Sequence, residues 1–257
     1  MTRFVHPLTL LAVIAVPATG WFVANWSGGT TLAVYWFETI ATCLFISAQI
    51  SLQQRWNPRR GHFRYAAPSG GRGSNESSFV RGFLVTSLTF SAAHGVFLGG
   101  MLFVLNHNGD STLADVDWRS VGLGCLSVFV FLVIDFFVDL AGLRQRSFRQ
   151  MEESANQALS RVAVVHLVLI FGLFAVAITS APAAMFGVFV VLKSLIALNS
   201  VVPPWEPATA PEWLSRVMNR VPNRHPGKRF EDVWAADRAD ELARRARNDQ
   251  PWAGRST

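Results

Sequence analysis

Residues 120–143 read SVGLGCLSVFVFLVIDFFVDLAGL, and this segment decides the fold class of the chain. No Asp, Glu, Lys or Arg occurs over 120–134. A helix that crosses a bilayer needs about 20 mostly apolar residues, a length that core helices of soluble proteins rarely sustain. The segment therefore predicts a transmembrane helix, and it carries two carboxylates, Asp135 and Asp139, toward its end.

Long uncharged stretches recur along the chain, at 4–37, 82–109 and 162–192. They predict an all-α, polytopic membrane protein with six transmembrane helices in three hairpins. The expected spans are about 5–25, 31–52, 82–105, 120–143, 162–180 and 183–202. We expect 1–202 to form the transmembrane domain and 203–257 a basic, partly helical cytoplasmic tail.

The first span also resembles a signal peptide, because Arg3 precedes an apolar run at 8–16 and small residues near Ala18. An uncleaved helix fits better, since the apolar run continues through Trp21-Phe22-Val23. The second span then follows after only a short turn at Ser27-Gly28-Gly29.

The distribution of arginine predicts the orientation. The connections at 53–81 and 144–161 are rich in arginine, whereas the one at 106–118 has three aspartates and no basic residue. The positive-inside rule places both termini and both basic loops in the cytoplasm, in a multi-pass protein of the cell inner (plasma) membrane. Arginine outnumbers lysine 21 to 2, which points to a GC-rich bacterial genome.

A pI near 10.3 is also typical of nucleic-acid-binding proteins. Here topology and attraction to anionic lipid headgroups explain the same charges, so no nucleic-acid partner is expected. In the tail, 212–221 reads as a basic amphipathic helix at the membrane interface. Residues 230–247 read as a mixed-charge helix that either docks on the cytoplasmic face or stays solvated.

Ionisable residues lie inside five of the six spans. Each costs roughly 3 kcal/mol in hydrocarbon on insertion scales, so such groups usually face the bundle interior or a water-filled cavity. The candidates for a buried polar site are Glu38, His94, Asp135, His166 and Lys193, with Asp139, Tyr35 and Trp36 secondary.

Asp135 and Asp139 are four residues apart, so their carboxylates share one helix face with Cβ atoms about 6 Å apart. Such a pair favours a shared proton or a bound cation. Asp139 lies near the cytoplasmic boundary and alternatively pairs with Arg144 or Arg146. Lys193 lies too deep to reach water easily, and it needs a carboxylate partner or must lose its proton. Its expected partner is Glu38 or Asp135.

Each candidate also has a purely structural interpretation. Glu38 can be a protonated side chain hydrogen-bonded to a neighbouring helix, and His94 a packed histidine beside Gly95 and Gly99, whose spacing lets helices approach. As metal ligands, His94, His166, Glu38 and Asp135 are weak candidates for a divalent ion. No His-Glu-x-x-His spacing is present.

Four short motifs together resemble an uncharacterised integral-membrane family of bacteria and archaea, domain of unknown function 6498, over about residues 5–200. They are Tyr35-Trp36-Phe37-Glu38, His94-Gly95-x-Phe97, Arg161-Val-Ala-Val-Val-His166 and Val191-Leu192-Lys193-Ser194-Leu195. The resemblance implies a multi-helix membrane protein with emphasis on Glu38, His94, His166 and Lys193. It implies no activity, and Asp135 and Asp139 are not part of its pattern.

Three functions remain open from the sequence. The favoured one is a transport-like or partner-binding membrane protein with a buried polar site. The second is a membrane-embedded metal-dependent enzyme, and the third is a structural or assembly subunit of a membrane complex. Beyond the lipid bilayer, the expected partners are a membrane protein or a second copy of the chain. If the polar side chains line one cavity, transport is favoured; if each is separately paired and dry, the structural role is favoured.

Overall fold

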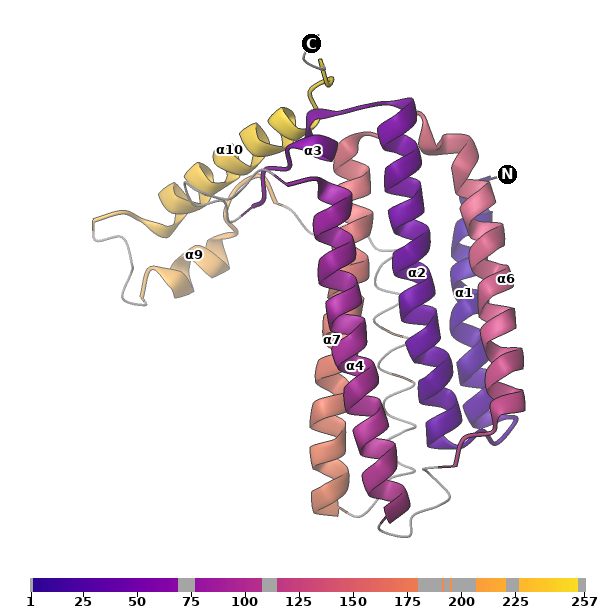
Figure 1. Cartoon of the computed structure of the whole chain (residues 1–257). Coiled ribbons are helices and arrows are strands. Elements are labelled where there is room, and N and C mark those ends of the chain that lie inside the picture. Colours follow the sequence, from indigo (N-terminus) through magenta and orange to yellow (C-terminus); the bar gives the residue numbers. More distant parts are fainter. Residues whose placement is uncertain are drawn as a thin grey trace. The chain divides into compact units, whose positions relative to one another are not determined.

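The computed structural model describes residues 2–68, 77–107, 115–179, 207–220 and 227–253, together with Val191 and Leu195. Over these residues the chain forms eight helices and no strand, which confirms the predicted all-α class (Figure 1). The long helices are α1 Thr2–Phe22, α2 Gly28–Trp56, α4 Phe79–His107, α6 Trp118–Leu143 and α7 Phe148–Thr179. The shorter ones are α3 Arg60–Phe63, α9 Glu212–Met218 and α10 Phe230–Asn248.

Three of the described helices are long and apolar enough to cross a membrane: Gly28–Trp56, Phe79–Val104 and Trp118–Leu143, with mean hydropathies of 1.4, 1.5 and 2.5. A shorter apolar helix, Leu11–Phe22, lies in α1. Apolar helices of this length indicate a membrane protein. Most of the sixth predicted span, 183–202, lies outside the described residues.

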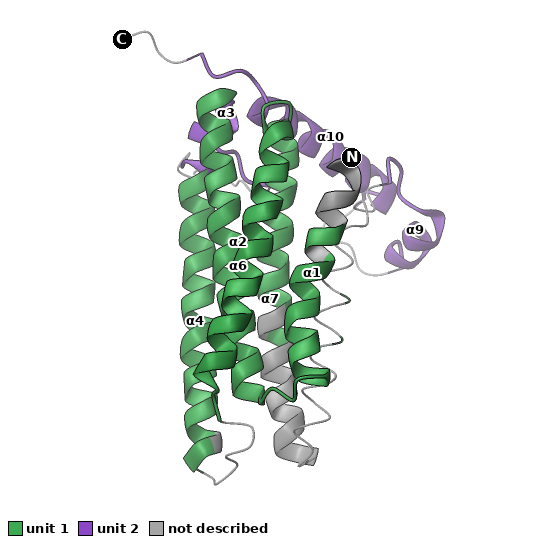
Figure 2. Cartoon of the chain, turned by 90° about the vertical axis from the view of Figure 1, so that its right-hand side faces the viewer, with its two compact units in different colours: residues 1–57, 80–202 green, residues 58–79, 203–257 purple. Residues whose placement is uncertain are grey.

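The chain forms two compact units, coloured separately in Figure 2. Unit 1 comprises residues 1–57 and 80–202, and unit 2 comprises 58–79 and 203–257. The segment that joins α2 to α4 therefore folds with the C-terminal tail, although the two are far apart in the sequence.

In unit 1, α2 packs against α1, α6 and α7. Val13, Val34 and Val128 form a buried cluster where α1, α2 and α6 meet. The most apolar window of α2 is 39% buried, compared with 11% for α6. Of the three candidate spans, the one with the highest hydropathy is thus the least buried, as expected of a helix that contacts lipid rather than a protein core.

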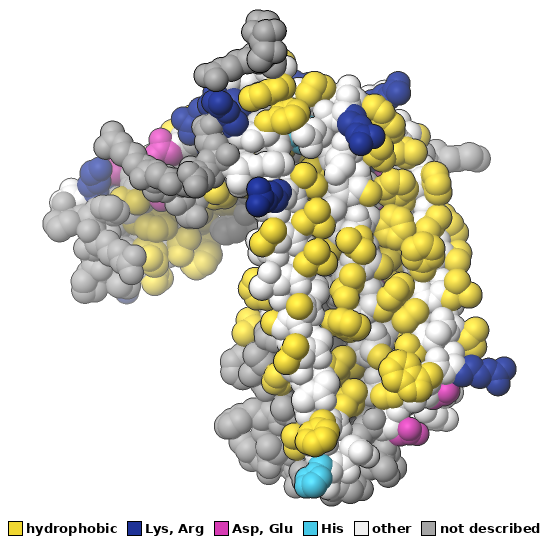
Figure 3. All heavy atoms as spheres, in the orientation of Figure 1, with side chains coloured by type: hydrophobic (Ala, Val, Ile, Leu, Met, Phe, Trp, Pro, Cys, Tyr) yellow, Lys and Arg dark blue, Asp and Glu magenta, His cyan; other side chains and the backbone are white. Residues whose placement is uncertain are grey.

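The outer surface of unit 1 is apolar. Figure 3 shows hydrophobic side chains spread over the visible face of the bundle, with charged side chains near the helix ends. Large exposed apolar residues include Val96 and Phe103 on α4 and Leu123, Leu126 and Phe137 on α6. An exposed apolar surface of this extent marks an interaction surface, and on long apolar helices it fits contact with acyl chains.

Two glycines of unit 1 make room for Trp26, in the turn between α1 and α2. A Cβ atom on Gly20 of α1 would lie 2.2 Å from the Trp26 ring, and one on Gly124 of α6 would lie 2.8 Å from it. Both distances are too short for a side chain. The indole therefore acts as a wedge between α1 and α6. Any residue larger than glycine at position 20 or 124 would displace it.

Gly95 of α4 has a similar role opposite α2. Trp36 donates its indole N–H to the Ser91 carbonyl oxygen at 2.9 Å, and a Cβ atom on Gly95 would lie 2.9 Å from the same ring. The prediction that Gly95 lets a neighbour approach is confirmed. For Gly99 the structure gives no described atom within 4 Å of such a Cβ, so the predicted close approach does not extend to this residue.

The start of α7 corrects the sequence interpretation. The segment 144–161 reads as a basic loop, but the helix begins at Phe148 and runs through the predicted boundary at 162. The reason is a buried stripe at helical spacing, formed by Phe148, Met151, Ala155, Ala158 and Val162. A search for uniformly apolar windows misses an amphipathic helical extension of this kind.

In unit 2, backbone hydrogen bonds join the segment around α3 to the residues that follow α10. Arg60 donates its N–H to the Gln250 carbonyl at 2.8 Å, and Trp252 donates to Pro58 at 3.1 Å. The Phe63 and Trp252 rings stack with centroids 4.8 Å apart. The predicted helix at 230–247 is confirmed as α10, and it is part of a folded unit.

His62 of α3 is completely buried in unit 2. Its Nδ1 atom accepts a hydrogen bond from the Arg59 N–H at 3.0 Å. Burial lowers the pKa of His62 to about 4, because removal from water disfavours the charged imidazolium. The side chain is therefore neutral at physiological pH.

Candidate functional site

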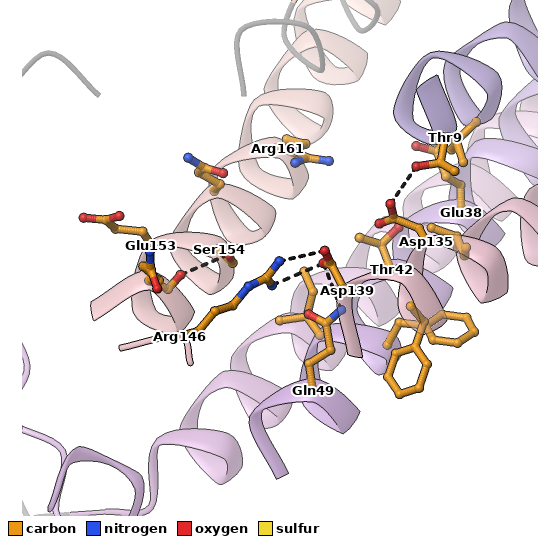
Figure 4. A pocket seen from close by; sticks show the side chains of 17 residues that line it. Thr9, Glu38, Thr42, Gln49, Asp135, Asp139, Arg146, Glu153, Ser154 and Arg161 are labelled. Atoms are coloured by element: carbon orange, nitrogen blue, oxygen red, sulfur yellow. Dashed lines mark hydrogen bonds and ion pairs between the residues drawn. The ribbon is translucent and has the colours of Figure 1, made fainter. Parts of the chain in front are cut away.

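A cavity of about 310 Å³ lies inside unit 1, between α1, α2, α6 and α7 (Figure 4). Its ionisable lining residues are Glu38, Asp135, Asp139, Arg146, Glu153 and Arg161. The wall contributed by α2 extends from Glu38 to Gln49, eleven positions apart. At 1.5 Å per residue this is about 16 Å, or roughly half the thickness of the hydrocarbon core.

The Gln49 end of the cavity holds an ion pair. Arg146 donates to both carboxylate oxygens of Asp139, with Nη2–Oδ1 at 2.6 Å and Nη1–Oδ2 at 3.2 Å. Gln49 adds a third hydrogen bond from Nε2 to Oδ2 at 3.3 Å. The prediction that Asp139 pairs with a nearby arginine is confirmed for Arg146. Arg144 instead lies over the Trp56 ring, 4.9 Å from its centroid.

One helical turn before Asp139 on α6, Asp135 has a different environment. The Thr9 hydroxyl of α1 donates to its Oδ1 atom at 2.6 Å, which ties α1 to α6 across the cavity wall. The two aspartates thus share the cavity, as their spacing predicts, but they bind different partners. A carboxylate that accepts a hydrogen bond from a neutral hydroxyl can still bind a proton or a cation. A carboxylate whose two oxygens both pair with one arginine is less able to do so.

Arg161 of α7 is the functional candidate that the sequence interpretation misses. It lies across the cavity from Glu38 and Asp135 (Figure 4) and interacts electrostatically with both. Its Nε atom is buried and has no hydrogen-bond partner among the described residues. An arginine keeps its charge in any protein environment, so this guanidinium is a permanent cation inside the bundle.

Two features of the sequence point to Arg161 in hindsight. The apolar stripe that starts at Phe148 places position 161 well inside a helix, and the motif Arg161-Val-Ala-Val-Val-His166 begins with this residue. Assigning 144–161 to a loop hides both. Arg161 lies near Glu38 and Asp135, the two carboxylates that the sequence interpretation offers as alternative partners of Lys193.

The other candidates have different locations. His94 is buried on α4 and does not line the cavity. Tyr35 is buried on α2, one turn before Glu38, and Trp36 contacts α4. His166 lies on α7, but its side chain lies outside the described part of the structure, as does Lys193 altogether. The predicted Lys193–carboxylate pair stays a prediction.

The side chains that line the cavity bear on the prediction that the protein binds a divalent metal ion. Among the described residues, no group of three or more His, Cys, Asp or Glu side chains is arranged to hold a metal ion. The described cavity lining offers carboxylate, hydroxyl and amide oxygens but no imidazole or thiolate. Oxygen donors of this type suit protons and hard cations rather than zinc or copper.

The fold and cavity together define a helical protein that has three helices long and apolar enough to cross a membrane and a charged interior cavity. The chain matches the model of a family of unknown function (DUF6498) over residues 3–222. The protein belongs to this family, which confirms the resemblance seen in the sequence motifs. The match ends before α10. The comparisons with curated proteins and with solved structures found no match.

Proposed function

We propose that this protein is a multi-pass membrane protein that takes up protons or small cations in the unit 1 cavity, in a transport-like role. The carrying observation is the cavity itself, which brings Glu38, Asp135 and Arg161 from three helices to one site whose α2 wall is about half as long as a bilayer core is thick. Ionisable groups at such depth are characteristic of proton relays and ion pathways.

Arg161 supplies the chemical basis of the proposal. A carboxylate near a fixed cation stays ionised, and it becomes easier to protonate when that cation turns to another partner. Glu38 and Asp135 both attract Arg161, so protonation of one carboxylate favours pairing of the guanidinium with the other. Such an exchange links occupancy of the site to the position of α7 relative to α2 and α6.

We further propose six spans with both termini in the cytoplasm of a bacterial inner membrane. The support is the arginine bias of the connections and the length of the uncharged segments. In this topology the Asp139–Arg146 end of the cavity faces the cytoplasm and Glu38 lies deepest.

The second candidate is a structural role, which two observations favour. The Asp139–Arg146–Gln49 cluster and the Thr9–Asp135 hydrogen bond both tie separate helices together. Buried polar contacts of this kind can specify one packing arrangement without binding anything. The two candidates differ in whether the carboxylates change protonation state.

Infrared difference spectroscopy of the full-length protein in nanodiscs tests the proposal. A pH step should produce a protonated-carboxyl band that is lost in Glu38→Gln or Asp135→Asn and shifts in D₂O. Asp237→Asn, on the exposed surface of α10, is the matched control and should leave the band unchanged. A spectrum without any titrating carboxyl that depends on Glu38 or Asp135 would contradict the proposal and favour the structural role.

A further inference from the structure

Helix α9 in unit 2 presents apolar side chains that the described residues leave uncovered. Trp213, Val217 and Met218 are 61%, 54% and 39% exposed. Trp213 and Val217 are four residues apart and therefore lie on one face of the helix. Arg216 and Arg220 lie beside them and are also exposed. The helix thus combines an apolar face with a basic flank.

Helix α9 is fixed in this orientation by Asn219. The Asn219 Nδ2 atom donates to Glu231 Oε2 at 2.9 Å, and its Oδ1 atom accepts the Phe230 N–H at 2.8 Å. The first bond lowers the pKa of Glu231, since it stabilises the ionised carboxylate. Asn219 thereby joins the end of α9 to the beginning of α10 and leaves the apolar face of α9 outside the contact.

Helix α10 is in turn anchored to the segment before α4. Arg244 donates to the Ala66 carbonyl at 2.8 Å, and the Asn248 side chain pairs with the Ala66 N–H and carbonyl, both at 3.1 Å. Arg59 donates to the Asp249 carbonyl at 3.0 Å. Unit 2 is therefore a folded unit that includes α9. Within this unit three apolar side chains of α9 are exposed.

The charge distribution in unit 2 identifies the ligand chemistry. Over 212–229 the sequence has five basic residues and one acidic residue, whereas α10 has four arginines and five acidic residues. The positive charge is concentrated beside the exposed tryptophan. A basic flank next to an apolar face fits the anionic surface of a bilayer, where aromatic rings enter the headgroup region and arginines pair with phosphates.

We propose that α9 binds the surface of an anionic membrane leaflet, with Trp213, Val217 and Met218 in the acyl boundary and Arg216 and Arg220 on the headgroups. A helix of seven residues is too short to fold stably alone, so attachment to α10 preorganises it for binding. The inference depends on the membrane location of the protein and is independent of what the unit 1 cavity binds.

Spin-label accessibility in the full-length protein tests the proposal. Cys43 and Cys125 are replaced by alanine, and a nitroxide is attached at Trp213→Cys, or at Glu212→Cys as the exposed polar control on the same helix. The protein is then placed in nanodiscs of phosphatidylcholine with or without phosphatidylglycerol. With the anionic lipid, the label at 213 should gain collisions with O₂ and lose those with a water-soluble nickel chelate. The label at 212 should remain accessible to nickel.

A charge variant makes the test specific. Each basic residue near an anionic surface contributes about 1 kcal/mol, so loss of one arginine lowers the docking equilibrium about fivefold. Arg216→Gln with Arg220→Gln should return the label at 213 to water. Nickel accessibility at 213 in both lipids would overturn the proposal, as would equal insertion in both. Shielding of the label from both reagents would also overturn it and would indicate a protein occupant.

Discussion

The two units use their arginines in opposite ways. In unit 1, Arg146, in the turn after α6, pairs with Asp139 of that helix, and Arg161 interacts with carboxylates on two other helices. In unit 2, Arg244 and Arg245 both pair with Glu241, three and four residues away on the same helix. These pairs lower the pKa of Glu241 to about 2, since two cations stabilise one carboxylate.

The difference shows how the surroundings decide what a charge contributes. A pair three or four residues apart on one helix contributes only about 0.3–0.5 kcal/mol, so the larger contribution of Arg244 to unit 2 is its hydrogen bond to the distant Ala66 carbonyl. A charge between apolar helices must be compensated, and in unit 1 groups from other helices contribute to this: Gln49 of α2 donates to Asp139, and Arg161 interacts with Glu38 and Asp135. Arginine thus meets carboxylates of neighbouring helices in unit 1 and a carboxylate of its own helix in unit 2.

The largest predicted effect is at the unit 1 ion pair. Asp139→Asn leaves Arg146 without its carboxylate, and we expect a loss of about 3 kcal/mol, at the low end for buried pairs because Arg146 is partly exposed. Unfolding in mixed detergent micelles measures the loss. The double variant Asp139→Asn with Arg146→Gln should recover part of it, and Asp237→Asn on α10 should change stability by less than about 0.5 kcal/mol. Equal losses in the single and double variants would refute the ion-pair explanation.

Unit 2 should instead respond to acid through His62. Its pKa is about 4 in the folded protein and 6.5 when unfolded, so the unfolded state binds more protons between these values. The contribution of His62 is complete above the unfolded pKa and is lost as the pH falls through this window. Between pH 7 and 5 we expect a loss of about 2 kcal/mol from unit 2.

Hydrogen exchange of the Ala66 amide, which binds Asn248, reports the stability of unit 2 as a function of pH. His62→Gln should abolish the acid-dependent loss of protection, whatever it does to stability at neutral pH. Persistence of the full pH dependence in this variant would show that another group is responsible.

A smaller effect separates packing from charge in unit 1. Gly124→Ala places a methyl group against Trp26 and Val34, at 2.8 and 2.9 Å, and should cost about 1–2 kcal/mol. Gly99→Ala is the matched control in another long helix and meets open space among the described atoms. It should be neutral or stabilise by up to about 1 kcal/mol through helix propensity. Similar unfolding midpoints for the two variants would contradict the wedge role of Trp26.

The sequence predicts most of the helices of unit 1, because long uncharged segments are a strong pattern and α6 follows its predicted range closely. It also predicts that Asp139 meets Arg146, since both lie near one membrane boundary. Arg161 is missed because the first turns of α7 are amphipathic. Their mean hydropathy is low, so a search for apolar segments assigns them to a loop. The assembly of unit 2 is missed because it depends on hydrogen bonds between segments about 190 residues apart, such as the one from the Arg59 side chain to the Asp249 carbonyl, for which the sequence has no periodic pattern.

The spacing of residues in the sequence does not predict which side chains line the cavity. Glu38, Asp135 and Arg161 come from three helices whose relative rotation is set by packing, including the wedge of Trp26 between Gly20 and Gly124. The depth of each residue follows from its position in a span. Which of them share a cavity does not, and this is why the sequence does not predict that His94 lies outside the cavity lining.

The central claim is that the charged groups of unit 1 line an aqueous cavity. Thiol labelling tests this most directly, with single cysteines at Thr42, which lines the cavity, and at Leu44, which is exposed on the apolar outer surface of the same helix. With Cys43 and Cys125 replaced by alanine in the full-length protein in proteoliposomes, a charged, membrane-impermeant reagent should modify Thr42→Cys from the cytoplasmic side only and leave Leu44→Cys unmodified. No reaction at position 42 from either side would contradict the claim, because it would mean that the buried charges are dry and serve packing alone.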